Sequence, residues 1–333
     1  RDDDKIYGAI IVFCNIAKVF SYESGDIAAP YVEAFNRMHD YFINFLPHLL
    51  NNFENEKACH IAYYIIKIYY LSSTRKLDVI IRSSENANKW LFILHSILEK
   101  KYKGDLIKKS EKPEEIKILS ENIFWKIKIY SMKIFNNFYT KYAYMGRFQD
   151  NLLQDFSKII KEIYSEKFFN IYLNILFSSK EEFVPDLMGG YIFRFFSDAI
   201  SNNHSSILEK INTNLEVILK DYLIQSVFLR MEDIELWKND VKSYLIKQFN
   251  FLEGFNSLRN NAIKFTNELC KYKKINANGK KEKNPFYFEN LYKFFVSVLE
   301  VYSDHIKNGV QTDFRIKEAV LSIIENISEH IIE

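Results

Sequence analysis

The residues of this chain best suited to chemistry are four carboxylates gathered around one tryptophan. The acids are Glu232, Asp233, Glu235 and Asp240, and the tryptophan is Trp237. Such a group can ligate a metal ion or present negative charge to a basic protein. The same residues also suit a structural role, in which acids favour the first turn of a helix and the indole packs beneath them. Both interpretations stay open at this point.

The spacing of these residues tests the metal interpretation. Asn239, Asp240 and Ser243 match the start of N-D-x-x-S-x-x-x-E, the second magnesium motif of all-α isoprenoid synthases. The final position of the motif holds Lys247, a cation where the metal needs an oxygen ligand. The one aspartate-rich stretch, Asp2–Asp4, lies at the chain terminus rather than deep in a helix. A magnesium-dependent isoprenoid synthase is therefore kept as a remote alternative, and the pattern predicts no catalytic residue, metal or cofactor.

Other signatures of catalytic or metal sites are missing from the sequence. Cys59 and His60 are adjacent in a helical run, so their side chains diverge, and no C-x-x-C or H-E-x-x-H spacing occurs. No glycine-rich phosphate loop occurs either. Gly189 and Gly190 fall inside a helical stretch, where they indicate a close helix–helix contact or a kink. These patterns predict that the protein is not an enzyme.

Composition limits the remaining classes of function. Among the 333 residues the net charge is +2, which leaves no general basic field for binding nucleic acid directly. The three cysteines are far apart and odd in number, which favours free thiols in a reducing compartment. The longest nearly uninterrupted apolar run, Ile6–Ala17, is too short to cross a bilayer. We therefore expect no membrane anchor.

Apolar residues recur at helical spacing through most of the chain. The last helix shows the pattern well, with apolar side chains three or four positions apart at Ile316, Val320, Ile323, Ile324, Ile327 and Ile331. Only 5 prolines and 9 glycines interrupt such runs, and no break is long enough to be a linker between domains. About a dozen helices joined by short turns predict an all-α, right-handed α-solenoid of about six HEAT-like helix pairs, forming a single segment over residues 1–333.

The acidic stretch also carries a family resemblance. Glu235-Leu236-Trp237, followed by Asp240 and Tyr244-Leu245, resembles the D-E-E-L-W-x-x-D-P-x-E-Y-I signature of the importin-beta superfamily, and most closely its importin-seven/importin-eight type. The aromatic run that follows is similar to K-F-D-V-F-E-D-F in that branch, and the segment that begins at Trp125 is similar to W-K-C-K-K-W. The residues that carry the resemblance as structural positions are Trp125, Trp237, Tyr244, Phe249, Phe251 and Phe255.

The resemblance implies a central fragment of a nuclear transport receptor. Such receptors shuttle between cytoplasm and nucleus as monomers, bind basic cargo proteins under the control of Ran-GTP, and pass pores by contacting FG-repeat nucleoporins. In this interpretation Glu232, Asp233, Glu235 and Asp240 form an acidic patch that contacts cargo or Ran. An export receptor of the same superfamily and a general HEAT-repeat scaffold remain as alternatives.

Overall fold

The computed structural model describes the chain except residues 1, 24, 53–54, 75–77, 111, 145–149, 250–256, 275–281, 283–284 and 329–333. For residues 2, 3, 248 and 249 it describes the backbone alone. The described part is helical and contains no strand. It groups into two compact units, Arg1–Tyr172 and Leu173–Glu333. Since each unit is described by itself, the expectation of one continuous segment over residues 1–333 stays a prediction.

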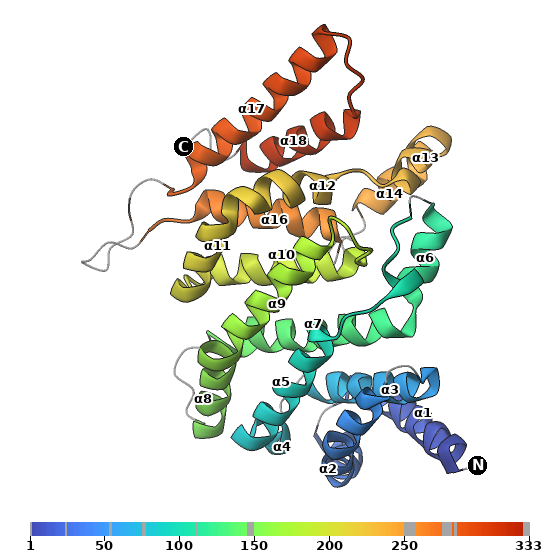
Figure 1. Cartoon of the computed structure of the whole chain (residues 1–333). Helices are drawn as coiled ribbons and strands as arrows, with labels where there is room; N and C mark the ends of the chain where they lie inside the picture. Colours follow the sequence, from blue (N-terminus) through green and yellow to red (C-terminus); the bar gives the residue numbers. More distant parts are fainter. Residues whose placement is uncertain are drawn as a thin grey trace. The chain divides into compact units, whose positions relative to one another are not determined.

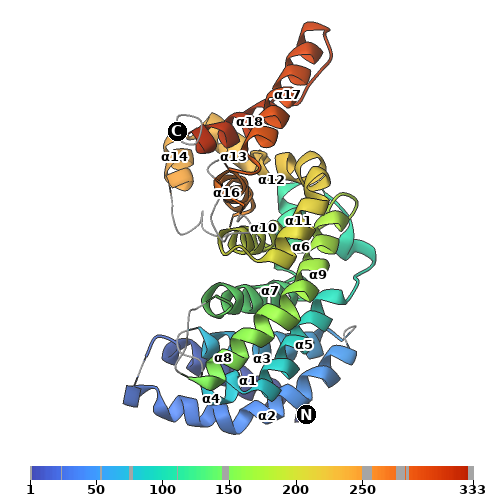
Figure 2. The ribbon, with the colours of Figure 1, turned by 90° about the vertical axis from the view of Figure 1, so that its left-hand side faces the viewer.

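The first unit is built from pairs of helices joined by short turns (Figure 1). Its elements are α1 (Asp2–Phe20), η1 (Gly25–Ile27), α2 (Ala29–Asn51), α3 (Glu56–Ser73), α4 (Val79–Arg82), α5 (Ser84–Glu99), η2 (Gly104–Ile107), α6 (Pro113–Glu121), α7 (Ile123–Tyr142), α8 (Asn151–Lys158), η3 (Ile159–Tyr164) and the start of α9 (Ser165–Ser178). Helix α2 packs on α3 and α5 packs on α7. Helix α3 also lies between α1 and α7, so these three form one row (Figure 1, Figure 2).

Short polar side chains fix where the helices of this unit begin. Asn55 accepts hydrogen bonds from the backbone of Lys57 and Ala58 at the start of α3. Asn122 and Asp150 cap α7 and α8 in the same way. Each cap satisfies a backbone N–H that the first turn leaves without a partner.

Aromatic side chains fill the core of the first unit. Tyr69 of α3 stacks on Trp90 of α5, with ring centroids 3.8 Å apart. Phe135 of α7 stacks on Phe168 of α9 at 3.6 Å. All four side chains are fully or almost fully buried. The many phenylalanines and tyrosines of the sequence thus supply the apolar surface that holds successive helix pairs together.

The second unit repeats this construction. Its elements after α9 are α10 (Asp186–Ser201), α11 (Ser205–Val217), η4 (Ile218–Leu223), α12 (Ile224–Val227), α13 (Met231–Asn239), α14 (Val241–Phe249), α16 (Leu258–Lys271), α17 (Phe288–Lys307) and α18 (Phe314–Ile327). Helix α16 packs along α10 and α12 and against α18, and α17 packs on α18. A Cβ added to Gly189 in α10 would lie 2.8 Å from Cδ1 of Leu258 in α16. The glycine therefore marks a close helix–helix contact, one of the two roles expected for it.

Two long helices contain a π turn, in which the backbone winds one residue wider than in an α-helix. The first, η3, joins α8 to α9, and the second, η4, joins α11 to α12. Each carries a tyrosine that donates a hydrogen bond to a backbone carbonyl of the preceding helix pair: Tyr164 to Asn88, at 3.0 Å, and Tyr222 to Phe177, at 3.1 Å. In the described part of the chain, no helix is both long and apolar enough to cross a membrane.

Candidate protein-binding surface

Three acids of the predicted patch lie on α13, and the fourth, Asp240, stands between α13 and α14, two short helices that follow α12 and precede α16 in the chain (Figure 1). They pack on each other and meet at Asp240. Glu232 and Asp233 stand in the first turn of α13, where negative charge is favoured by the helix dipole. Arg230, immediately before α13, forms an ion pair with Asp186 at the start of α10, at 2.7 Å. The pair of short helices is thereby tied to the longer helices of its unit.

Asp240 caps the start of α14. Its carboxylate accepts hydrogen bonds from the backbone N–H of Ser243 at 3.0 Å and from the hydroxyl of Ser243 at 2.5 Å. These bonds lower the pKa of Asp240 below its ordinary value, because they stabilise the charged form. The N-D-x-x-S pattern is thus explained by a helix cap. Among the described residues no group of three or more His, Cys, Asp or Glu side chains is placed to hold a metal ion.

Asp233 does not belong to an open patch, contrary to the sequence-based expectation. Its side chain is only 12% exposed, and one carboxylate oxygen lies 2.7 Å from Nζ of Lys247 in α14. The ion pair links the two short helices across the hairpin. The sequence pattern missed it because Lys247 is far along the chain and reaches Asp233 only when the helices pack.

Glu232 and Glu235 are the two acids of the patch that remain open. Both side chains are exposed on α13, and neither forms an ion pair with any residue that the structure describes. An exposed carboxylate without a partner is free to meet an incoming cation at little cost in desolvation. The predicted patch of four acids is therefore reduced to these two.

Trp237 is not a core residue, which corrects the expectation that it packs beneath the acids. Its side chain is 51% exposed, and its one described ring contact is an edge-to-face packing against Tyr244, with centroids 5.1 Å apart. The reason lies in the size of α13, whose nine residues bury Asp233 and Ile234 and leave most of the rest outside. The indole thus contacts α14 through Tyr244 and keeps about half of its surface exposed.

Other large apolar side chains of the two short helices are exposed as well. The exposed ones on α13 and α14 are Met231, Trp237, Val241, Leu245 and Ile246. Together with Glu232 and Glu235 they make up what we call the acidic hairpin surface. The sequence analysis did not single out these apolar side chains, because spacing along one helix does not show which of its apolar residues stay exposed. Monomeric proteins seldom leave a contiguous apolar patch open unless it has a partner.

The other signature aromatics have a different position. Trp125 is 4% exposed, donates a hydrogen bond from Nε1 to the carbonyl of Leu106 at 3.1 Å, and packs edge to face on Tyr102. It is thus a buried structural residue that holds the turn before α6 against α7. The side chain of Phe249, and all of Phe251 and Phe255, lie outside the described residues.

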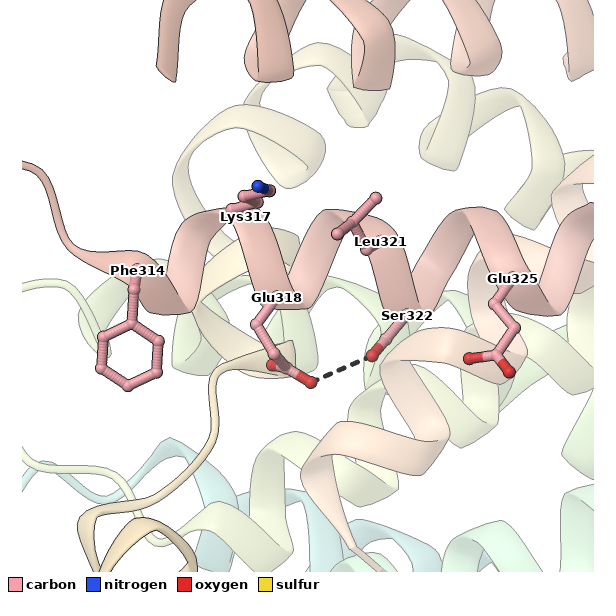
Figure 3. A pocket seen from close by; sticks show the side chains of 6 residues that line it. All are labelled: Phe314, Lys317, Glu318, Leu321, Ser322 and Glu325. Atoms are coloured by element: carbon pink, nitrogen blue, oxygen red, sulfur yellow. Dashed lines mark hydrogen bonds between the residues drawn. The ribbon is translucent and has the colours of Figure 1, made fainter. Parts of the chain in front are cut away.

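A hollow along α18 is lined by residues of that helix alone, from Phe314 to Glu325 (Figure 3). Glu318 in this hollow receives a hydrogen bond from Ser322 at 3.0 Å and is also paired with Arg259 of α16 at 2.6 Å. A surface supplied by one helix does not enclose a ligand on several sides, as sites for small molecules do. The acidic hairpin surface is therefore the stronger candidate.

Comparison with known proteins gives sequence relatives of one kind. The chain is 22% identical over 336 residues to an importin beta-like SAD2 homolog of Arabidopsis thaliana, covering 98% of this chain and 30% of that protein. It is 19% identical over 258 residues to Importin-8 of Homo sapiens, covering 75% of this chain and 23% of that protein. No protein-family model matches the chain.

A solved structure shows the same fold. The exportin Cse1, in its cargo-free, cytoplasmic state, superposes with a TM-score of 0.70 at 16% identity, over 96% of this chain and 32% of that one. This likeness confirms the predicted all-α HEAT-repeat solenoid. The chain spans less than a third of the length of each protein that it matches.

Proposed function

This chain belongs to the importin-beta superfamily, and we propose that it is part of a nuclear transport receptor that binds basic protein segments through the acidic hairpin surface. The observation that carries the proposal is that Glu232 and Glu235 are exposed, without an ion-pair partner among the described residues, on the same short helix as the half-exposed Trp237. Carboxylates pair with lysine and arginine, and an open indole face attracts the same cations.

The neighbouring residues support a protein partner rather than a small ion. Leu245 and Ile246 expose apolar side chains on α14, which suit the aliphatic parts of a bound peptide. An aromatic anchor next to charged groups is typical of the residues that dominate binding between proteins. Asp233 and Asp240, in contrast, are engaged within the hairpin and serve to hold its shape.

The finer parts of the function rest on the family. In this proposal the whole receptor shuttles between cytoplasm and nucleus, Ran-GTP controls its cargo, and FG-repeat nucleoporins bind elsewhere on it. Importin-type relatives favour import, while the likeness to an exportin keeps export as the second candidate. The two differ in the effect of Ran-GTP, which releases cargo from an import receptor and strengthens cargo binding to an export receptor.

The test is a pull-down with the whole protein, histones or ribosomal proteins as basic ligands, and Ran-GTP or Ran-GDP. We expect the double variant Glu232→Lys/Glu235→Lys to weaken binding about tenfold or more. The control is Glu209→Lys/Glu300→Lys, which makes the same charge change at exposed acids on α11 and α17. An equal loss of binding in both variants would show that net charge alone is responsible and would contradict a role of the acidic hairpin surface. Binding that is the same with Ran-GTP and Ran-GDP would favour a general HEAT-repeat scaffold over a transport receptor.

A further inference from the structure

A second surface, with the opposite charge, lies in the first unit where α3 meets α7. Tyr63, Lys67 and Tyr70 follow each other at spacings of four and three along one face of α3. Tyr130 and Lys133, three residues apart, likewise share one face of α7. The two helices pack side by side, and all five side chains are partly exposed. We call these five residues the tyrosine–lysine surface.

The side chains of this surface hold each other in place. The ring of Tyr130 packs edge to face against those of Tyr63 and Tyr70, with centroids 5.4 and 5.7 Å away. Nζ of Lys67 lies 5.3 Å from the ring centre of Tyr63 and donates a hydrogen bond to its hydroxyl at 3.2 Å. Nζ of Lys133 lies 4.4 Å from the ring centre of Tyr70. Both ammonium groups are thus fixed on aromatic rings, ready to bind without further ordering.

These two lysines have no acidic partner. Neither Lys67 nor Lys133 forms an ion pair with a described residue, whereas Lys89 on α5 pairs with Glu85 at 2.6 Å. Burial, and then repulsion from Lys67, lower the pKa of Lys133 below its ordinary value. The acid on the same face of α3, Glu56, lies beside His60 at 3.7 Å, nearer the start of the helix. Two partly buried like charges without a counter-ion destabilise the free protein.

Hydrogen-bond donors are also in excess on this face of α7. Asn137 follows Lys133 by four residues, and its Nδ2 is buried without a hydrogen-bond partner. The pKa of the Tyr130 hydroxyl is raised, mainly by burial and then by Tyr63, so it stays protonated and able to donate. Ammonium groups without an acidic partner, next to a protonated hydroxyl, are what a carboxylate ligand needs.

We propose that the tyrosine–lysine surface binds an acidic peptide segment of a partner protein, whose Asp and Glu carboxylates accept hydrogen bonds from Lys67 and Lys133. Nucleic acid fits less well, because binding single strands depends on open ring faces for the bases. Here the ring faces of Tyr63 and Tyr70 already meet Tyr130 or a lysine. The surface differs from the acidic hairpin surface in charge and in unit, so this inference does not depend on the proposed function.

The test uses the whole protein and a fluorescein-labelled peptide rich in Asp and Glu, with binding followed by fluorescence anisotropy. We expect Lys67→Gln/Lys133→Gln to weaken binding about tenfold or more, because two charge-assisted hydrogen bonds are lost. The control is Lys57→Gln/Lys89→Gln, which removes two lysines that already pair with Asp4 and Glu85. The control should bind within about twofold of the unchanged protein.

Thermal unfolding of each variant separates a loss of binding from a loss of structure. The Lys67→Gln/Lys133→Gln protein should melt close to the unchanged protein, since the substitution removes a repulsion together with two cation–π contacts. A milder variant, Tyr130→Phe, keeps the ring and should weaken peptide binding less than the double variant. Unchanged affinity in the double variant would overturn the proposal. So would tighter binding of a single-stranded oligonucleotide than of the acidic peptide, or no binding of the peptide to the unchanged protein.

Discussion

Nε1 of Trp90 donates a hydrogen bond to Nε2 of His39 at 2.9 Å, and both side chains are fully buried. The bond requires Nε2 to be unprotonated, so the proton of the neutral imidazole sits on Nδ1, which lies 3.3 Å from Oδ1 of Asp40. A second proton on the ring would place two N–H donors against each other. The histidine is therefore held neutral by its surroundings in the first unit.

This relationship makes stability depend on pH. Burial lowers the pKa of His39 below its ordinary value of 6.5, an effect larger than the opposing one of Asp40. Below that pH the unfolded chain binds a proton that the folded chain resists, so the contribution is complete above about pH 6.5 and is lost as the pH falls. Urea unfolding between about pH 7.5 and 5 should show a decline that is smaller in His39→Gln, which can accept from Trp90 without titrating. Parallel curves for the two proteins would contradict this.

The contact between Gly189 and Leu258 predicts opposite results for one substitution at two helical glycines. Gly8 in α1 has open space around its Cα, so Gly8→Ala should raise the free energy of unfolding by about 0.5–1 kcal/mol. At Gly189 the added carbon meets the side chain of Leu258, and Gly189→Val should lower it by roughly 1–3 kcal/mol. Gly189→Ala should lie between them, below Gly8→Ala. Chemical denaturation of the three variants measures the differences, and equal gains at both sites would show that α10 and α16 are not in close contact.

Arg259 joins three parts of the second unit. Its guanidinium binds both carboxylate oxygens of Glu318, at 2.6 and 3.0 Å, the hydroxyl of Ser322 at 2.8 Å, and the carbonyl of Val227. Arg259→Leu should lower the free energy of unfolding by about 1–3 kcal/mol, since it leaves Glu318 without its partner in a partly buried position. The matched control is Lys293→Leu, which breaks an exposed pair with Glu289 and should change it by less than about 0.5 kcal/mol.

The three cysteines should be unreactive in the folded protein. Cys14, Cys59 and Cys270 are fully buried free thiols, and burial raises the pKa of Cys59 to about 11 and that of Cys270 to about 12. A thiol-specific reagent such as Ellman's at mildly alkaline pH should react slowly with the native protein, since the thiolate is the reactive form, and with all three thiols in urea. Fast reaction of one thiol under native conditions would place it at the surface.

The sequence predicted the helices better than their surfaces. Ser257, a residue type that favours helix starts, stands just before α16, and its hydroxyl accepts a hydrogen bond from the backbone of Asn260 at 3.1 Å. Such caps and the spacing of apolar residues depend on neighbours along the chain, so they can be recognised in the sequence. The exposure of Trp237 and the burial of Asp233 depend on how α13 meets α14, which spacing within one helix does not fix.

The tyrosine–lysine surface was missed for the same reason. Lys67 and Lys133 lie in separate helices, and each by itself looks like an ordinary solvated cation. The detectable signal was the repeat of tyrosine and lysine at spacings of three and four in both helices. Only the packing of α3 on α7 brings the two rows together and shows that no acid of the described part of the chain pairs with these lysines.

The two π turns affect how structural repeats can be recognised in the sequence of this chain. The segments Ile159–Tyr164 and Ile218–Leu223 both start with two aliphatic residues, a lysine and an acid. One extra residue in each turn rotates the following stretch of helix by about 100°, and the tyrosine anchors that new phase to an earlier carbonyl. Successive units can thus share a geometric device while their sequences diverge. A search for repeats in relatives should therefore look for places where the apolar positions of a helix shift to a new face, and not for conserved sequence motifs.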